Sequence, residues 1–377
     1  MDLWEFRRKE YERRDMRLEQ RQRMKLKKAK ANKKYLHIVY VMTWTGICGG
    51  SKIILQHCNE LTKRGHKVTI VCHFPKPGWF LLDENVDFIQ VPMEEILCES
   101  IPSCDVIVAT YWKEIYECME QNIAPVVYFE QGDTHLFEPE SIDICTMAHI
   151  RKQITIAPFV YTVSSFAKEK LKENFGVDAM VIPNAIDKKI FFPKIAEVKH
   201  EGRTVITAIG SENIKFKCVF NIVVAIILLK KLGHDIEFVW ISPDAPSQLK
   251  SIPALVNPSQ NEIADCLRRS DIYVCASLYE SFCLPALEAM TCGAAVVTTD
   301  CGGIRDFAKD NVNALIIKKN DIADMMDKIE MLIKDAKLRQ SLSTEALKTA
   351  KQFDWTSTTD NLLVYYQNIA RHCVEGG

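Results

Sequence analysis

The chain has 377 residues, which is too long for one ordinary hydrophobic core, so we expect two domains. Hydrophobic residues make up 47% and charged residues 26% of it, a balance that excludes a disordered or fibrous protein. The longest nearly apolar run, Cys218–Leu229, has 12 residues and is too short to span a bilayer. A secretory signal is not expected, because the N-terminus is densely charged. We therefore expect a cytoplasmic location.

The net charge of −1 conceals two parts of opposite charge. Residues 1–34 hold 14 Lys/Arg and 6 Asp/Glu, a net charge of +8, which leaves −9 for the rest of the chain. This basic arm is rich in helix formers and has neither Gly nor Pro, so we expect it to be helical. Its apolar residues Trp4, Tyr11 and Leu18 form a stripe too thin to pack into a core.

Several partners fit such an arm. An anionic membrane surface suits apolar residues at one end with Lys and Arg throughout, and it would place the protein at the inner face of a membrane. A plain solvated helix or a subunit contact fits the same composition equally well. Nucleic acid is not expected, because no recognised binding module accompanies the arm.

Fourteen cysteines exceed average usage, but none forms a C-x-x-C pair. Zinc-finger and thioredoxin-like functions are therefore excluded. Most of the cysteines lie in apolar stretches, where thiols behave as small hydrophobic groups. We interpret them as reduced core residues of a cytosolic protein.

From residue 35 the sequence alternates between strand-like and helix-like segments. The expected strands of the first half are Tyr35–Met42, Lys67–Phe74, Asp105–Thr110, Pro125–Gln131 and Met180–Pro183, and the expected helices are Ser51–Arg64 and Tyr161–Phe175. Such an alternation predicts a parallel sheet with helices on both faces.

The alternation restarts in the second half. The expected strands there are Thr204–Gly210, Ile236–Ser242, Ile272–Ala276 and Ala294–Thr298, and the expected helices are Phe220–Leu232, Glu262–Arg269, Pro285–Cys292, 321–350 and 357–372. We therefore predict an α/β protein with two doubly wound, Rossmann-like domains over residues 35–192 and 193–355. Ligands of such sheets bind beyond the carboxyl ends of the strands, so a cleft between two facing domains is the expected site.

The first loop, Thr45–Ser51, runs from a strand directly into a helix and contains Gly49 and Gly50. Glycines let a backbone approach a ligand closely, and a helix start offers unpaired N–H groups to a phosphate. The loop is not G-x-G-x-x-G, however, and the second strand ends at 72–74 without an acidic residue. A nicotinamide enzyme is therefore not expected. Alone, the loop fits a structural turn equally well.

The most informative segment is Ser277–Gly293. Pro285 suits the first position of a helix, so Glu280 falls on the incoming loop and Glu288 one turn inside the helix. The backbone amides of Ser281–Leu284 would point to an anion or to sugar hydroxyls at the helix start. One carboxylate could then accept hydrogen bonds from a ribose and the other from a sugar. The alternative is two ordinary surface glutamates.

This segment resembles the E-x7-E region of the family 4 glycosyltransferases, which have the GT-B architecture of two Rossmann-like domains. The family typically has E-G-F-G-L-P-x-L-E-A-M-A-C-G-x-P-V-V, and this chain has E-S-F-C-L-P-A-L-E-A-M-T-C-G-A-A-V-V from Glu280, then Cys301–Gly303. Further matches are Gly49–Gly50, the interdomain segment 181–187 and Asp354–Trp355. The resemblance covers roughly residues 35–372, and it implies that residues 356–377 form a helix crossing back to the first domain.

The resemblance also implies the roles of individual residues. Lys217 would contact the diphosphate of a nucleotide-sugar donor, Glu280 the donor sugar and Glu288 the ribose; we take Lys217 and Glu280 as the catalytic pair. The other donor-binding residues that it implies are Gly49, Gly50, Ser211, Val256, Asn257, Phe282, Cys283 and Leu284.

Two departures from the family pattern affect the donor side. The family pairs Lys217 with an Arg six residues earlier, and this chain has Ser211 there. Lys215 could compensate, but it offers a point charge rather than a bidentate fork. The glycines of E-G-F-G are Ser281 and Cys283, which we expect to add bulk beside the donor sugar.

A third departure affects the acceptor side, where many relatives have a His and this chain has Gln131. His135 could fill that space. The chain contains no D-x-D sequence, so we expect neither a metal nor another cofactor. The family retains anomeric configuration by same-face attack, which makes the two carboxylates binding groups rather than an acid–base pair.

We therefore predict a retaining, metal-independent glycosyltransferase that moves a sugar from a nucleotide-sugar donor to a glycan or lipid-linked acceptor. Cell-surface polysaccharide or glycoconjugate synthesis is the expected setting, with the protein cytoplasmic or peripheral at the membrane. The alternative is a catalytically degenerate GT-B scaffold that binds a sugar nucleotide or a partner protein without turnover.

Overall fold

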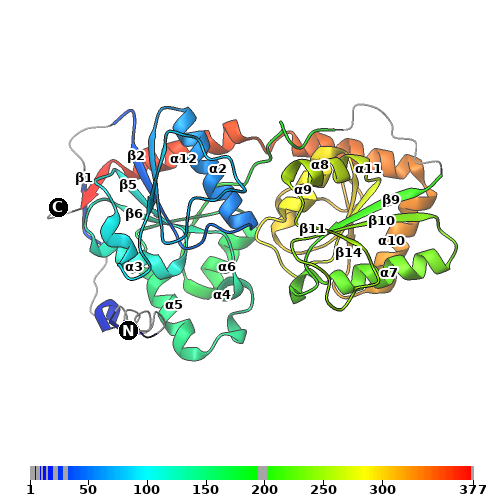
Figure 1. Ribbon diagram of the computed structural model, residues 1–377, viewed down its shortest axis with the longest axis horizontal. Coiled ribbons are helices and arrows are strands. Elements are labelled where there is room, and N and C mark those ends of the chain that lie inside the picture. The colour runs from blue at the N-terminus through cyan, green and yellow to red at the C-terminus, as the bar shows by residue number, and fades with distance from the viewer. Residues whose placement is uncertain are drawn as a thin grey trace. The chain divides into compact units, whose positions relative to one another are not determined.

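The protein is represented by a computed structural model in which the chain forms two compact units (Figure 1). Unit 1 comprises Met1–Pro183 and Thr356–Gly377, and unit 2 comprises Asn184–Trp355. The structure describes residues 5, 9, 12–13, 16–19, 24–28, 33–193 and 202–374. Within that part of the chain, no helix is both long enough and apolar enough to cross a bilayer.

Unit 1 is built on a seven-stranded parallel sheet in the order β4-β3-β2-β5-β6-β7-β8. Its strands are β2 (His37–Met42), β3 (Lys67–Cys72), β4 (Val86–Gln90), β5 (Val106–Ala109), β6 (Val126–Glu130), β7 (Phe159–Thr162) and β8 (Met180–Val181). The order reverses between β2 and β5, which is the switch point where doubly wound sheets bind ligands.

The helices of unit 1 are α2 (Gly49–Lys63), α3 (Ile115–Glu120), α4 (Thr134–Phe137), α5 (Ile144–Ile156), α6 (Ser165–Phe175) and α12 (Trp355–Ile369), with 3₁₀ turns at 97–100, 112–114 and 139–141. The last helix, α12, is fixed to the sheet by buried phenols. The Tyr366 hydroxyl lies 2.9 Å from those of both Tyr40 on β2 and Tyr161 on β7. The C-terminal residues therefore complete the core of unit 1.

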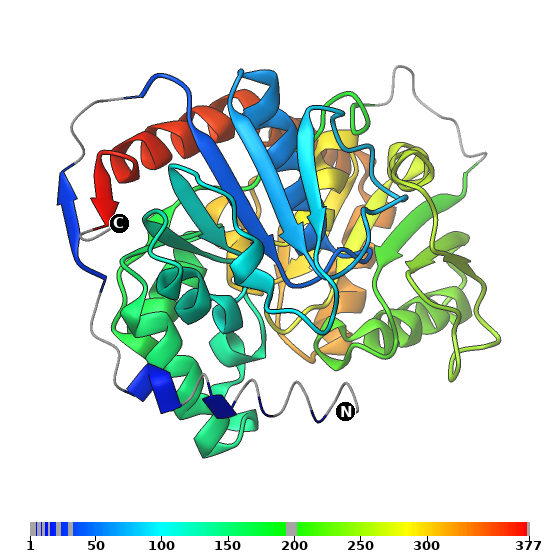
Figure 2. The ribbon, with the colours of Figure 1, turned by 60° about the vertical axis from the view of Figure 1, so that its left-hand side comes forward.

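The basic arm is not helical throughout, which corrects the prediction. Leu26–Lys28 form β1, which pairs antiparallel with β15 (His372–Val374), as the blue and red strands of Figure 2 show. The backbone hydrogen bonds of this pairing outweigh the helix propensity of the segment, since propensity is a weak constraint once tertiary contacts form. Of the predicted apolar stripe, Trp4 and Tyr11 lie outside the described residues.

The described part of the arm also packs against unit 1 more closely than expected. The side chain of Leu18 is buried, and Met24 joins the core of the unit. Arg17 pairs with Glu120 on α3 at 3.2 Å. The expectation that the arm's apolar residues cannot pack is therefore wrong for Leu18.

Unit 2 contains a six-stranded parallel sheet in the order β11-β10-β9-β12-β13-β14. The strands are β9 (Thr204–Ile209), β10 (Ile236–Ser242), β11 (Ala254–Val256), β12 (Ile272–Cys275), β13 (Ala295–Thr299) and β14 (Leu315–Ile317). The helices are α7 (Val219–Lys231), α8 (Gln260–Arg269), α9 (Leu284–Cys292), α10 (Ile322–Lys334) and α11 (Ala336–Ala350), with 3₁₀ turns at Lys215–Lys217 and Gly303–Asp306. The order reverses between β9 and β12. The predicted α/β class with two Rossmann-like sheets is confirmed.

Polar caps change the bounds of two predicted helices: one is divided in two, and the other starts later than expected. The expected helix 321–350 breaks at Asp335, whose carboxylate accepts from Leu338 N at 2.9 Å and starts α11. The expected helix Tyr161–Phe175 begins only after Ser164, whose hydroxyl accepts from Ala167 N at 3.0 Å, while Phe159–Thr162 is strand β7. In both places a side-chain oxygen satisfies an amide that the helix leaves unpaired.

The division between the units lies earlier than the predicted one after residue 192. The structure divides the chain after Pro183, because the next residues bond to unit 2. Ile186 N donates to Phe353 O at 3.3 Å, and Arg268 donates to Ile190 O at 2.8 Å.

Candidate functional site

The predicted donor residues of unit 2 follow the carboxyl ends of its strands. Ser211 comes just after β9, Glu280 after β12, and Val256 and Asn257 at the end of β11. The first two flank the point at which the strand order reverses. The fold therefore gathers these residues at the edge where open α/β sheets bind ligands.

Lys217 and Glu280 form an ion pair at this edge. The 3₁₀ turn Lys215–Lys217 carries the lysine, whose Nζ donates to Glu280 Oε1, and Ser277 Oγ donates to the same oxygen at 2.9 Å. Burial opposes the charge of Lys217, but the Glu280 carboxylate outweighs it and raises the pKa of the ammonium group. Both side chains stay partly exposed, at 20% and 15%. A cation is thus held in place where an anionic ligand can reach it.

The loop that carries Glu280 is fixed to the Gly-Gly loop of the sequence motif. Glu280 N donates to Cys301 O at 2.8 Å, and Gly303 N donates to Glu280 O at 3.0 Å. A Cβ on Gly303 would collide with the carbonyl oxygen of Ser281, so only glycine fits there. This close approach explains why the two motifs occur together.

Helix α9 starts from a left-handed residue. Cys283, which precedes the helix, has φ 66° and ψ 54°, a conformation that disfavours residues with a Cβ. Its thiol is buried, so the expectation that Cys283 adds bulk beside a donor sugar is wrong. Leu284 is the first residue of the helix, and its backbone amide belongs to the unpaired set of the first turn.

The ring of Phe282 is turned into the interior of unit 2. The ring is buried against Phe307 and Phe353, at centroid distances of 5.5 Å and 5.8 Å. This packing anchors the loop before α9 and leaves the Phe282 amide as the group that could meet a ligand.

Three buried thiols lie under this loop, a feature that the sequence analysis missed. Cys275 ends β12, Cys283 precedes α9, and Cys301 follows β13. The sulfur atoms of Cys275 and Cys283 are 3.7 Å apart, and the Cys301 thiol lies near enough to affect the pKa of both. The hydrogen bond with Cys283 and the neighbouring Cys301 thiol hold the pKa of the Cys275 thiol below its usual range. All three lie in or beside the matched motif, which is the signal that could have revealed them.

The two glutamates of the motif surround one phenol. Glu288 lies on α9 and is largely buried. Burial raises the pKa of the Tyr273 phenol well above its usual range, and the thiols of Cys275 and Cys283 and the carboxylates of Glu280 and Glu288 add to that effect. Both carboxylates therefore lie within electrostatic reach of Tyr273.

Ser211 supplies no charge at the position where relatives have Arg. Its buried hydroxyl donates to Asp244 Oδ2 at 3.0 Å and accepts from Asn213 N at 3.0 Å. These bonds shape the loop after β9. At the far edge, Val256 is exposed, and Asn257 N donates to Ser242 O at 2.7 Å.

In unit 1 the structure brings two predicted residues together. Helix α2 begins at Gly49, and the Gln131 side-chain amide donates to Gly50 O at 3.3 Å. A Cβ on Gly50 would lie 3.3 Å from the same amide nitrogen, so glycine allows the contact. Gly49, Gly50 and Gln131 thus lie at the carboxyl ends of β2 and β6.

His135 does not belong to an open acceptor site, which corrects its assignment. The ring is 1% exposed, and its Nε2 lies 2.7 Å from Glu130 Oε2. Burial disfavours both charges, yet each group offsets it for the other: the pKa of His135 is raised and that of Glu130 is lowered. Glu130 also accepts from Gly132 N at 2.6 Å. The pair holds the loop after β6.

Solved structures place both units in a known architecture. Sucrose-phosphate synthase from Thermosynechococcus elongatus superimposes with a TM-score of 0.74 at 15% identity, covering 88% of this chain and 98% of that one. Anabaena HepE in complex with UDP-glucose gives a TM-score of 0.72 at 15% identity, covering 89% and 100%. The class of protein is thus defined by its fold, GT-B.

The sequence comparison finds a family similarity in part of unit 2. Residues 252–349 match the family of glycosyl transferases group 1. The chain is 27% identical over 221 residues to an uncharacterized glycosyltransferase of Methanocaldococcus jannaschii, and covers 60% of its length. It is 36% identical over 106 residues to a D-inositol 3-phosphate glycosyltransferase of Stackebrandtia nassauensis, and covers 24% of that length. The expected resemblance is confirmed: residues 252–349 of unit 2 are similar to the glycosyl transferases group 1, within a GT-B fold.

Proposed function

We propose that the protein transfers a glycosyl group from a nucleotide-activated sugar to an acceptor. The observation that carries this proposal is the Lys217–Glu280 pair at the switch point of unit 2, inside the region related to group 1 glycosyl transferases. A UDP-sugar is the first donor to test, since HepE, which has the same fold, binds UDP-glucose.

Each group at the site has a task in this reaction. Lys217 would stabilise the negative charge that develops on the departing diphosphate. Glu280 would accept hydrogen bonds from hydroxyls of the donor sugar, and Glu288 from the ribose. The unpaired amides before α9 would bind the sugar or its phosphate.

We further infer retention of configuration, without a metal or another cofactor. The positive charge that a metal would supply to the leaving group is supplied by Lys217. Glu280 is engaged by Lys217 and Ser277, which suits a binding group rather than a nucleophile. Transfer should therefore persist in EDTA and give a product with the donor's anomeric configuration.

The acceptor that we propose is a glycan or a lipid-linked saccharide of cell-surface polysaccharide or glycoconjugate synthesis. WaaG, with a TM-score of 0.68, is a glycosyltransferase involved in lipopolysaccharide biosynthesis. A Campylobacter jejuni relative, 31% identical over 114 residues, is named for a diphospho-undecaprenol acceptor. Such acceptors favour a protein at the cytoplasmic face of a membrane.

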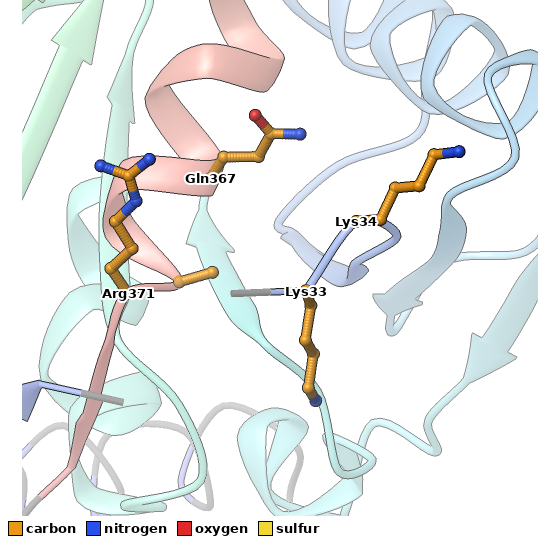
Figure 3. Close-up of a pocket in the computed structure, with 5 residues that line it drawn as sticks. Lys33, Lys34, Gln367 and Arg371 are labelled. Carbon is orange, nitrogen blue, oxygen red and sulfur yellow. The ribbon is translucent and has the colours of Figure 1, made fainter. Parts of the chain in front are cut away.

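A basic pocket in unit 1 supports a contact with an anionic membrane. It has a volume of about 280 Å³ and is lined by Lys33, Lys34, Gln367, Ala370 and Arg371. Figure 3 shows the three cationic ends pointing away from one another. This arrangement suits a spread anionic surface better than a single phosphate.

The test begins with a thermal-shift screen of nucleoside diphosphates and their sugars, because a ligand stabilises the folded state by mass action. The best donor is then incubated with lipid-linked and soluble glycan acceptors, and transfer of labelled sugar is measured. Product formation is the expected result. Binding without transfer or donor hydrolysis would instead favour a scaffold without turnover, a possibility that Ser211 at the Arg position raises.

A further inference from the structure

The thiol cluster of unit 2 has the geometry of a metal site. Sulfur ligands on a tetrahedral Zn²⁺ lie about 2.3 Å from the ion, which separates them from one another by about 3.8 Å. The sulfur atoms of Cys275 and Cys283 are already 3.7 Å apart. The thiol of Cys301 lies near both and affects their pKa, but it is not among the ligand atoms that lie within 4.8 Å of one another.

Glu280 completes the set of ligands. One of its oxygen atoms and the sulfur atoms of Cys275 and Cys283 all lie within 4.8 Å of one another. Two sulfurs and one carboxylate oxygen make three protein ligands, and a water molecule would complete the tetrahedron, as in open zinc sites. These thiolates and the carboxylate would carry more negative charge than the ion neutralises, and Lys217 beside Glu280 supplies a compensating charge.

The surroundings hold these ligands in place and leave a path for the ion. Cys275 ends a buried strand, and the loops of Glu280 and Cys301 are fastened to each other by backbone bonds. Glu280 keeps 15% of its side chain exposed, so an ion can enter beside it. Cys283 has a left-handed backbone conformation. Glycine would be unstrained in this conformation, so the cysteine side chain at this position has an energetic cost.

We propose that Cys275, Cys283 and Glu280 bind a thiophilic divalent cation, Zn²⁺, and that this ion competes with the donor sugar for the Glu280 carboxylate. On binding, each thiol releases its proton to water and the thiolate coordinates the ion. The second half of the proposal rests on the proposed function, because it assigns Glu280 to the sugar. Zn²⁺ is thus an inhibitor of a reaction that itself needs no metal.

Metal binding is tested without any substrate. The full chain, reduced and freed of metal, is titrated with Co²⁺, whose absorption reports tetrahedral sulfur ligands, and Zn²⁺ is then added in competition. The expected result is one such site with Zn²⁺ displacing Co²⁺. The variant Cys283→Gly should fold, because glycine relieves the left-handed strain. Its affinity for the metal ion should fall by more than about 100-fold, since loss of a residue that only contacts a ligand costs about 10–100-fold.

The matched control is Cys98→Ala. Cys98 lies in a second buried group of possible ligands, with Glu114 and Glu117 in unit 1. The Co²⁺ signal should survive this change. Loss of the signal in Cys98→Ala with retention in Cys283→Gly would overturn the proposal, and so would absence of any sulfur-ligated Co²⁺ in the wild-type chain.

To test the competition between Zn²⁺ and the donor sugar, we would measure the affinity for the donor that the thermal-shift screen identifies. Zn²⁺ should weaken donor binding in the wild type by about tenfold or more near saturation, and EDTA should reverse the effect. In Cys283→Gly, the affinity for the donor should be the same with and without Zn²⁺. Unchanged donor affinity with Zn²⁺ bound would refute the competition, whereas failure of the proposed function would show as no donor binding in either state.

Discussion

Lys217 is the residue on which the proposed chemistry depends most. Replacing it with Ala removes the cation that meets the leaving diphosphate, so we expect kcat to fall by about 10²–10³-fold. Lys230→Ala is the control, since Lys230 is exposed in the last turn of α7 and should change kcat only slightly. Steady-state kinetics with the identified donor measures both. Near-normal turnover of Lys217→Ala would remove its assigned role.

Cys283 offers a test of backbone strain. A residue with a Cβ in the left-handed region costs about 1–2 kcal/mol relative to the right-handed one. We therefore expect Cys283→Gly to be more stable than Cys283→Ala by about 1 kcal/mol, although both lose the thiol. Urea unfolding of the two variants, measured on the metal-free chain, gives the difference. Equal stabilities would show that φ 66° is not strained here.

The His135–Glu130 pair predicts a pH dependence of stability. The raised pKa of His135 adds stability that is complete below its usual 6.5 and is lost as the pH rises through the folded-state pKa. The lowered pKa of Glu130 adds stability that is complete above its usual 4.5 and is lost as the pH falls. The pair therefore contributes fully between these two values.

His135→Gln should accordingly reduce the free energy of unfolding by about 1–3 kcal/mol near pH 5.5 and by less near pH 9. Thermal unfolding across this range measures the change. The control is His234→Gln, since the His234–Glu330 pair is partly exposed and should contribute little. A cost for His135→Gln that does not vary with pH would contradict the assignment.

At the level of residues, the sequence predicted which positions gather but not what each side chain does. Gly303 and Glu280 could be matched from the motif, because its spacing is fixed by the close approach of two loops. The burial of His135 could not be predicted, since it depends on Glu130 five residues earlier facing the same way. The proximity of Cys275 and Cys301 could not be predicted either, because it depends on the pairing of β12 with β13.

Among the elements, α12 depends on a triangle of phenols. Tyr366→Phe removes one hydrogen-bond partner from each of the buried hydroxyls of Tyr40 and Tyr161. We therefore expect the free energy of unfolding of unit 1 to fall by about 1–3 kcal/mol. Replacing all three tyrosines by Phe removes the orphaned hydroxyls and should recover most of that loss. Denaturant unfolding tests this, and a triple variant weaker than the single one would contradict it.

The strands that sequence analysis missed are short or lie at sheet edges. β11 and β14 have three residues each, too few for a period-two pattern to be visible. β4 lies at the edge of its sheet, and only the first of its five residues, Val86, is buried. β10, by contrast, is a long apolar run and was predicted with its bounds, Ile236–Ser242.

The whole molecule should bind anionic membranes through unit 1. Lys34→Gln combined with Arg371→Gln removes two cations from the basic pocket, each worth about 1 kcal/mol near such a surface, so binding should fall by about 30-fold. Lys230→Gln with Lys231→Gln on α7 is the matched control. Sedimentation with vesicles of phosphatidylserine and phosphatidylcholine measures the effect. Equal loss in both variants would mean that only net charge matters.

The path of the chain, which leaves unit 1 at Pro183 and returns to it at Thr356, has a consequence for biosynthesis. Domains fold as units while the ribosome adds residues. Unit 2 is complete in sequence before Tyr366 emerges, whereas Tyr40 and Tyr161 must wait for it. Unit 1 is therefore synthesised first but completes its fold last. A nascent chain stalled before α12 contains all of unit 2 but only part of unit 1.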